Sequence, residues 1–220
     1  MSVWMLWMAA LAAAVGTSFF EMPWSQFAAR AEAKQVIRFE TVDTNLMSAA
    51  VLHETNRRRA ENKLRPLRHH AKAVQTAAIQ SQIMAKRGSI SHENPEHEKF
   101  RTLMKRVQSV GVNPGLAAEN VATAFGLRYE SGKGFYKRVE RGKTIFSYTP
   151  EGPGLAAHTY EGFAKAVVDS WMGSPGHRKN VLLPDAEYLG VSCVLSKSES
   201  EMPLFYCTQV FLAPLRPTRR

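Results

Sequence analysis

A chain of 220 residues with 45% hydrophobic side chains is long enough for one sizeable core, but too short for two ordinary domains and their flanking segments. Its 29 Lys and Arg residues outnumber its 19 Asp and Glu residues, and the resulting net charge of +10 favours contact with anionic surfaces. The sequence has no zinc-finger spacing, no RNA-recognition signature and no basic helix with interleaved aromatic residues, so we do not expect a nucleic-acid-binding protein.

The N-terminal segment has no charged side chain from residue 2 to residue 20. Its apolar part has the length of a signal-peptide core, and Ala29-Arg30-Ala31 has the small-x-small form of a cleavage site. A basic start is missing, however, and the uncharged run is long enough to cross a bilayer. We interpret residues 1–31 as a signal peptide or an N-terminal membrane anchor, with residues 3–20 as the tether in the second case. The alternative is a buried first helix; in the first two cases we expect an extracytoplasmic protein.

A linker and two helices are predicted next. Residues 32–44 mix polar, charged and small side chains without a strong period, which is typical of a linker. The domain is predicted at residues 45–212. Its first helix covers about residues 45–62, where apolar residues recur at helical spacing, and its second covers about residues 71–86 and is closed by Gly88.

The next segments contain two candidate functional residues. A loop by composition follows Gly88 and contains His92. Short helices are then predicted at about residues 98–110 and at 116–125, and the second of these carries Glu119. Taken separately, His92 is an ordinary loop residue, and Glu119 is an acidic residue well placed for a helix dipole.

A basic insertion is predicted at about residues 127–160. Between residues 128 and 143 there are six basic and two acidic side chains, and Arg141-Gly142 is a plausible turn between two strands. This pattern favours a hairpin whose charge is either a solvated face or a binding surface for an anionic partner. At the other end, residues 213–220 are predicted to form a basic C-terminal tail.

Another candidate residue follows a sharp helix end. An apolar run closes at Trp171, and Gly173 with Ser174-Pro175-Gly176 breaks the helix, because glycine frees φ and proline lacks a backbone donor. We therefore predict that His177 lies in a turn with its ring directed into a cleft. A turn histidine that caps backbone carbonyls is the alternative.

Two segments near the C-terminus, residues 188–195 and 204–211, are rich in β-branched and aromatic residues, as strands are. They are predicted to form two arms of a hairpin. With the loop centred near Ser200, Cys193 and Cys207 lie opposite one another and close enough for a disulfide. Such a bond indicates an oxidising compartment. Two buried thiols are the alternative.

Residues 45–212 contain, in this order, the segments Asn56–Arg59, Leu64–Leu67, Met84–Gly88 with Ser91-His92, Arg106–Gly111, Ala118–Ala122, Trp171–Leu182, Leu189–Val191 and Cys207–Phe211. In their sequence and order these segments resemble the CAP superfamily, which groups cysteine-rich secretory, antigen 5 and pathogenesis-related proteins, and in particular its bacterial SCP-like branch. The resemblance implies an α+β fold, a three-layer α-β-α sandwich with a small antiparallel sheet between helices.

The resemblance also implies a surface cavity, lined in many members by two histidines and two glutamates. His92 matches the first histidine, Glu119 the first glutamate and His177 the second histidine, whereas Ser174 stands where other members have the second glutamate. Imidazole and carboxylate groups are ligand types for zinc and similar divalent ions. A metal ion held by His92, Glu119 and His177 is therefore one hypothesis, weakened by the missing carboxylate.

From these observations we predict a secreted or membrane-tethered binding module of the cell envelope. Its partner is an anionic lipid, a wall polymer or a protein, bound at the His/Glu-lined cavity with help from the basic hairpin. A divalent-metal-dependent hydrolase that uses the same cavity is the alternative. In a third hypothesis the motif residues only stabilise the fold. We expect binding rather than catalysis, because binding is the broader theme among CAP proteins.

Overall fold

The central sheet of the computed structural model has four strands in the order β1-β5-β6-β2. They are β1 (Arg68–His69), β2 (Leu116–Phe125), β5 (Tyr188–Leu195) and β6 (Leu204–Ala213). Strands β5, β6 and β2 are antiparallel neighbours, whereas the two-residue β1 pairs in parallel with β5. The structure describes residues 18–196 and 201–215. Residues 1–17, the loop centre near Ser200 and the end of the basic tail therefore lie outside the described residues.

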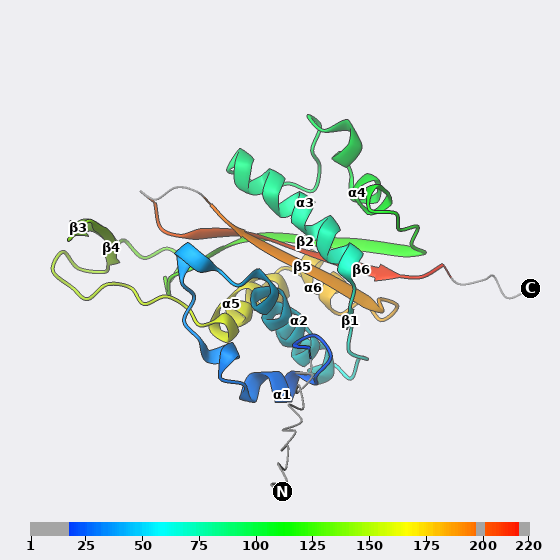
Figure 1. Cartoon of the computed structure of the whole chain (residues 1–220), viewed down its shortest axis with the longest axis horizontal. Helices are drawn as coiled ribbons and strands as arrows, with labels where there is room; N and C mark the ends of the chain where they lie inside the picture. Colours follow the sequence, from blue (N-terminus) through cyan, green and yellow to red (C-terminus); the bar gives the residue numbers. More distant parts are fainter. Residues whose placement is uncertain (1–17, 197–200, 216–220) are drawn as a thin grey trace, which may run out of the picture.

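Helices cover both faces of the sheet, so the predicted three-layer α-β-α sandwich is confirmed (Figure 1). On one face lie α3 (Ala71–Arg87) and α4 (Leu103–Ser109), and on the other lie α2 (Thr44–Glu61), α5 (Tyr160–Gly173) and α6 (Pro175–Val181). The predicted ends of the first two domain helices are confirmed to within one residue. None of the helices among the described residues is long and apolar enough to cross a membrane.

Sequence-local signals fix the ends of these helices. The Asp43 carboxylate accepts a hydrogen bond from the backbone N–H of Leu46 at 2.9 Å and so caps α2, and Thr159 caps α5 in the same way. Helix α3 ends at Gly88, whose φ of 76° is a left-handed conformation that glycine adopts without strain. Helix α3 also packs tightly on the sheet, because a Cβ atom at Gly190 would lie 2.1 Å from the backbone of Ala73.

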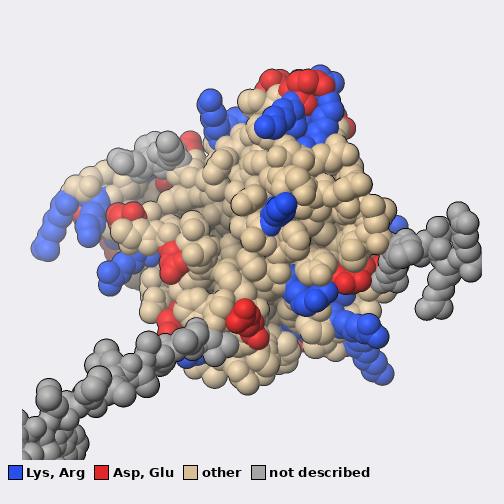
Figure 2. All heavy atoms as spheres, turned by 45° about the vertical axis from the view of Figure 1, so that its right-hand side comes forward, with Lys and Arg blue, Asp and Glu red and all other residues tan. Residues whose placement is uncertain are grey.

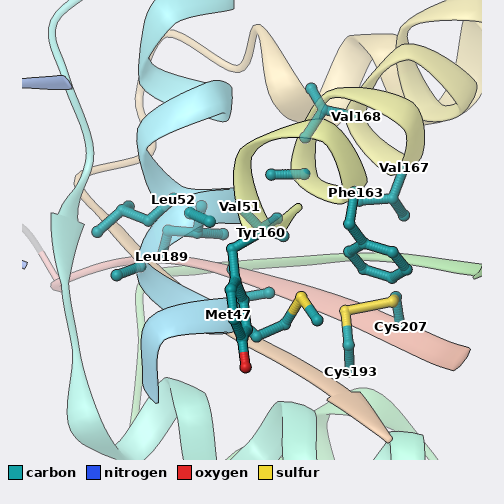
Figure 3. Close-up of a cluster of buried hydrophobic side chains, with 14 of the residues drawn as sticks. Met47, Val51, Leu52, Tyr160, Phe163, Val167, Val168, Leu189, Cys193 and Cys207 are labelled. Atoms are coloured by element: carbon teal, nitrogen blue, oxygen red, sulfur yellow. A yellow bond between two sulfur atoms is a disulfide. The ribbon is translucent and has the colours of Figure 1, made fainter. Parts of the chain in front are cut away.

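The main core lies between the sheet and the layer of α2 and α5 (Figure 3). Met47 and Val51 of α2 and Phe163 and Val167 of α5 are buried there. The predicted disulfide between Cys193 and Cys207 is confirmed. Its two residues are directly paired in the β5–β6 ladder, as the predicted hairpin register requires.

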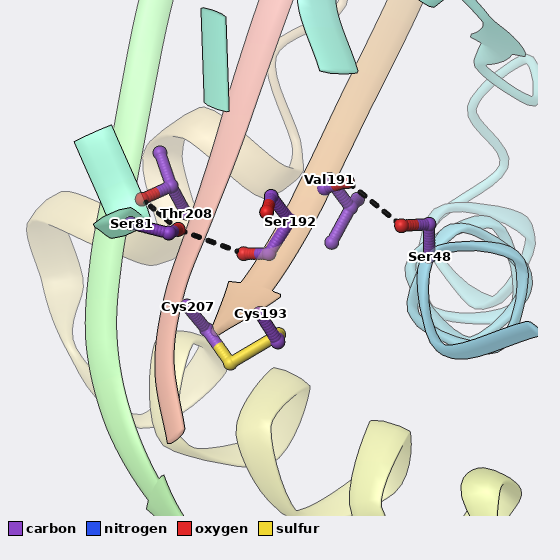
Figure 4. The surroundings of a disulfide bond; sticks show 7 residues. All are labelled: Ser48, Ser81, Val191, Ser192, Cys193, Cys207 and Thr208. Atoms are coloured by element: carbon purple, nitrogen blue, oxygen red, sulfur yellow. Dashed lines mark hydrogen bonds between the residues drawn. A yellow bond between two sulfur atoms is a disulfide. The ribbon is translucent and has the colours of Figure 1, made fainter. Parts of the chain in front are cut away.

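Serine side chains from helices of both layers form hydrogen bonds with strand β5 near the disulfide (Figure 4). The hydroxyl of Ser48 in α2 donates to the carbonyl of Val191 at 2.9 Å, and that of Ser81 in α3 donates to the carbonyl of Ser192 at 3.0 Å. The sheet is therefore held from both sides at β5.

Two predicted helices are wrong in whole or in part. Residues 116–125 form strand β2 rather than a helix, because ten consecutive residues pair with β6 and these backbone hydrogen bonds outweigh the helix preference of an alanine-rich segment. The helix predicted at 98–110 is divided into a 3-10 turn, Glu98–Phe100, and α4. The division arises because the side chain of Thr102 caps α4 by accepting a hydrogen bond from the N–H of Lys105.

The segment before α2 is part of the domain, which corrects the prediction of a linker at residues 32–44. Phe27 of the short helix α1 (Trp24–Ala29), Ala33 of the turn Glu32–Lys34, and Ile37 are all buried in the main core. A further 3-10 turn, Phe39–Thr41, leads into α2. The N–H of Ile37 also donates to the carbonyl of His158 at 2.9 Å. Cleavage after Ala31 would remove the buried ring of Phe27 from this core.

The predicted basic hairpin is present as a separate two-stranded sheet, β3 (Tyr136–Glu140) and β4 (Lys143–Ser147). Its turn lies at Arg141-Gly142, and both residues have positive φ, 49° and 75°. This geometry is typical of the two-residue turns that match the twist of a hairpin. The hairpin projects from one end of the sandwich, beyond the end of β2 (Figure 1).

Candidate functional site

The candidate site is built around the middle of β2, which is an edge strand of the sheet. Successive side chains of a strand point to opposite faces, so the side chains of the adjacent residues Glu119 and Asn120 contact different helical layers. Glu119 contacts α4 and the loop after α3, whereas Asn120 contacts α6. The Glu-Asn pair thus joins the two helical layers at the open edge of the sheet.

Glu119 is a buried carboxylate with two charged or polar neighbours. One oxygen, Oε2, accepts a hydrogen bond from Nη2 of Arg106 at 2.7 Å, and the other, Oε1, accepts one from Nδ1 of His92 at 2.9 Å. The Arg106 side chain is completely buried and that of Glu119 is 3% exposed, whereas the His92 ring is 52% exposed. Because the carboxylate can only accept, Nδ1 carries a proton and Nε2 is the ring nitrogen available to a ligand.

The loop that carries His92 is held by buried polar side chains. Gln80 of α3 donates to the carbonyl of Ser91 and accepts a hydrogen bond from the Asn94 amide at 2.7 Å. Arg106 donates to the carbonyl of His92 at 3.2 Å and to that of Phe100 at 3.0 Å. Gln80, Asn94 and Arg106 are all fully buried. The position of His92 is therefore set by the core beneath it, although its ring reaches the surface.

His177 lies on the other side of the edge strand, in the short helix α6. The predicted turn is wrong here: Ser174 is a one-residue junction, and Pro175 occupies the first position of α6, where its missing N–H costs nothing. The Asn120 amide donates to the carbonyl of His177 at 3.1 Å. Asn180 donates to Asn120 Oδ1 at 2.9 Å and to the backbone carbonyl of Glu119 at 3.1 Å, which ties α6 to the strand.

The two histidines are close enough to influence each other's charge, and their pKa values move in opposite directions. The hydrogen bond to Glu119 raises the pKa of His92 above its ordinary value, although partial burial of the ring opposes this shift. Burial lowers the pKa of His177, and repulsion from His92 lowers it further. The cluster therefore favours one charged imidazole, at His92, beside a neutral one.

Ser174, the remaining predicted cavity residue, has a structural role in its backbone. Its N–H donates to the carbonyl of Trp171 at 3.2 Å, and its carbonyl accepts from the N–H of Arg178 at 2.8 Å, so it ends α5 and begins α6. The Ser174 hydroxyl does not cap α6. Two cavities of about 590 and 420 Å³ lie against the N-terminal segment, and neither is lined by His92, Glu119, Ser174 or His177.

The arrangement does not fit the metal site predicted from His92, Glu119 and His177. Both carboxylate oxygens of Glu119 are already engaged, and the guanidinium of Arg106 would repel a cation placed beside them. Within residues 18–196 and 201–215, no group of three or more His, Cys, Asp and Glu side chains is arranged to hold a metal ion. We therefore assign no chemical step to a metal.

Arg106 is the site residue that sequence reasoning missed as a functional group. It lies next to the fully buried Val107 and three residues after Leu103, which packs on the same small core cluster. A charged residue in line with the apolar face of a helix is the signal that predicts a buried ion pair. Gln80 and Asn94 carried no comparable signal, because their partners are backbone and side-chain groups brought together only by the fold.

Comparisons with known proteins agree with this architecture. The model of the cysteine-rich secretory protein family, CAP, matches residues 52–211. The chain is 29% identical over 148 residues to the uncharacterised protein YkwD of Bacillus subtilis (strain 168), an alignment that covers 67% of this chain and 42% of that protein. A solved structure of an extracellular SCP-domain protein from Bacillus anthracis str. Ames superimposes with a TM-score of 0.51 at 24% identity, over 77% of this chain and 41% of that one. The chain thus spans about two-fifths of the length of either protein.

Proposed function

Because the chain belongs to the cysteine-rich secretory protein (CAP) family, we propose that it is an extracytoplasmic binding protein of the cell envelope, whose ligand contacts the cluster of His92, Glu119 and His177. The observation that carries this proposal is the orientation of His92. A buried carboxylate holds Nδ1, which leaves Nε2 of this half-exposed ring as the nitrogen available to a ligand. A histidine ring whose orientation is fixed by a buried hydrogen bond is suited to contact a ligand at the surface.

The charges of the cluster favour an anionic ligand group. Arg106 and Glu119 form a buried ion pair and largely cancel each other's charge. Protonation of His92 therefore adds a positive charge on a half-exposed ring, and Nε2–H then donates a charge-assisted hydrogen bond to a phosphate or carboxylate. Since Glu119 raises the pKa of His92, more of this imidazole is charged near neutral pH than of an ordinary histidine.

Several independent features support a location outside the cytoplasm. The Cys193–Cys207 disulfide is a type of bond that persists in oxidising compartments. The sequence has an uncharged stretch from residue 2 to residue 20, which is typical of targeting segments. The superimposed SCP-domain structure is that of an extracellular protein. Anionic lipids and wall polymers are accessible there.

A divalent-metal-dependent hydrolase, the alternative from the sequence, is not proposed. That reading needs Glu119 as a ligand or as a general base, and its oxygens are instead held by Arg106 and His92. A carboxylate whose two oxygens accept hydrogen bonds from a buried guanidinium and an imidazole is poorly suited to remove a proton from water.

The proposal is tested by titrating the full chain with glycerol phosphate, a soluble anion that resembles lipid headgroups and wall-polymer units, while histidine ring signals are followed by NMR. We expect the ring signals of His92 to shift and the affinity to rise as the pH falls. His92→Gln removes a charged donor and should weaken binding about tenfold or more. His97→Gln, which alters an exposed histidine outside the cluster, is the matched control. Equal affinities in both variants would contradict the proposal.

A further inference from the structure

The β3–β4 hairpin carries exposed basic and apolar side chains on a part of the chain that projects from the sandwich. We call this set the hairpin surface, and it consists of Phe135, Tyr136, Lys137, Val139, Arg141 and Lys143. Figure 2 shows lysine and arginine side chains gathered on the projection at its left, where Figure 1 places β3 and β4. The candidate site lies elsewhere, at the middle of β2.

The positive charge of the hairpin surface is not neutralised by the rest of the described chain. Of the six basic residues between 128 and 143, Lys133 pairs with Glu130 and Arg138 pairs with Glu140, each at 2.5 Å. The other four, which include the three exposed cations of the hairpin surface, form no ion pair with a described residue. Arg141 and Lys143 lie at the tip of the hairpin and Lys137 lies nearer its base, and the three unpaired charges add to one another.

Apolar side chains are exposed beside these charges. Phe135 is 46%, Tyr136 51% and Val139 68% exposed, and these are among the most exposed large apolar residues of the described chain. Side chains alternate along a strand, so Tyr136 faces the side opposite to that of Phe135 and Val139. Apolar groups on both sides of a projecting hairpin are unusual for a surface that contacts only water.

The hairpin is firmly attached at its base, which makes this exposure a fixed property. Phe146 of β4 is 5% exposed and packs with Leu127 and Met202 in a small core of its own. Arg138 crosses the hairpin and donates to Ser147 Oγ at 2.7 Å and to the carbonyl of Gly152 at 2.8 Å. The buried and hydrogen-bonded groups thus hold the base of the hairpin. The ring of Phe135 packs partly on those of Tyr129 and Phe146, and the remaining side chains of the hairpin surface are exposed.

We propose that the hairpin surface docks the protein on an anionic lipid bilayer. Lys137, Arg141 and Lys143 are attracted to acidic headgroups, while the rings of Phe135 and Tyr136 and the side chain of Val139 enter the interface between headgroups and acyl chains. Aromatic rings with one polar end are favoured at that depth. A soluble polyanion satisfies the cations equally well but offers nothing to the apolar side chains, so the combination favours a membrane.

The proposal is tested by co-sedimentation of the full chain with vesicles of phosphatidylcholine alone and with vesicles that also contain phosphatidylglycerol. The uncharged N-terminal segment is common to all variants, so differences between variants report on the hairpin. We expect preference for the anionic vesicles that weakens as salt rises. The triple variant K137S/R141S/K143S should lose this preference by roughly 100-fold, or about fivefold for each cation.

Two matched control variants show whether the loss of vesicle binding is specific to the hairpin surface. R65S/K86S/K99S removes the same number of exposed lysines and arginines elsewhere and should keep most of the preference for anionic vesicles. F135S/V139S should weaken vesicle binding more than V36S/M104S, which alters exposed apolar residues elsewhere. Thermal unfolding checks that each variant remains folded.

Either of two outcomes overturns the proposal. In the first, the two triple variants bind anionic vesicles equally. In the second, dextran sulfate displaces the protein from vesicles and F135S/V139S binds both partners like the wild type, which indicates a polyanion site. The hairpin variants leave the glycerol phosphate titration of His92 as an independent readout, so failure here and failure of the proposed function are distinguishable.

Discussion

Glu119→Gln preserves the shape of the side chain at the centre of the cluster and removes its charge. Arg106 then remains positive with no exposed surface, and its neighbours are the carbonyls of Phe100 and His92 and a neutral amide. Removing one partner of a buried ion pair leaves an uncompensated charge, so we expect the free energy of unfolding to fall by about 3–5 kcal/mol. The same change removes the main cause of the raised pKa of His92, and that pKa should fall.

Urea denaturation near neutral pH measures the first effect, with the midpoint and the slope compared between variants. The control is Glu98→Gln, which breaks an exposed pair with Lys105 and should leave the free energy of unfolding almost unchanged, because solvent screens that pair. A second comparison replaces both buried partners by apolar residues, in R106M/E119L. This variant should be less destabilised than Glu119→Gln, because no unpaired charge is left behind.

A loss of stability below about 1 kcal/mol in Glu119→Gln would contradict an uncompensated buried charge, since it would mean that Arg106 gains solvent or another partner when the carboxylate is removed. An unchanged His92 pKa would refute the second half, in which the hydrogen bond from Nδ1 to Glu119 holds the imidazole in its charged form.

Three further predictions concern stability. Reduction of the Cys193–Cys207 disulfide should lower the free energy of unfolding by about 3 kcal/mol, measured by urea denaturation with and without reductant; no change would contradict the bond. Phe27→Ala should cost about 3–5 kcal/mol in the same assay, because the ring is 2% exposed, whereas a linker residue would cost almost nothing. Burial lowers the pKa of the His53 imidazole below its ordinary value of 6.5, so its neutral ring contributes to the free energy of unfolding above that pH, and this contribution is lost as the pH falls. In His53→Gln the free energy of unfolding should therefore decrease less steeply on acidification than in the wild type. An unchanged dependence of stability on pH would contradict this role of His53.

The pairing of β5 with β6 and the helices α2 and α3 were predictable because their signals are local in the sequence. Apolar residues at helical spacing marked α2 and α3, and the symmetric placement of Cys193 and Cys207 fixed the register of β5 and β6. The turn at Arg141-Gly142 was visible for the same reason, since the conformational freedom of glycine is a property of the residue itself.

Strand β2 was predicted wrongly because its structure depends on a partner. Residues 116–125 contain several alanines, which favour a helix in isolation, and only pairing with β6 makes the strand the more stable form. Because residues 116–125 were predicted as a helix, the positions of Glu119 and Asn120 relative to the two helical layers could not be predicted. In a strand, Glu119 and Asn120 face opposite layers, which a helix would not allow.

The resemblance placed His92, Glu119 and His177, but it did not define what Glu119 does. Its function depends on Arg106, whose guanidinium approaches from α4 and takes one carboxylate oxygen. Long-range contacts of this kind are set by the packing of whole layers, and no spacing in the sequence encodes them. The segment before α2 was predicted as a linker for a similar reason. Its buried residues, such as Phe27 and Ile37, do not recur at a helical or strand spacing, so the sequence does not show that they enter the core.

The pKa of His92, measured by NMR titration of the full chain with and without glycerol phosphate, decides whether Glu119 prepares this histidine for an anion. We expect a pKa above 6.5 in the free protein and a further rise when the anion binds, because bound negative charge favours the imidazolium. A pKa at or below 6.5 that does not respond to the anion would contradict the claim that Glu119 holds His92 as a charged ligand-binding group.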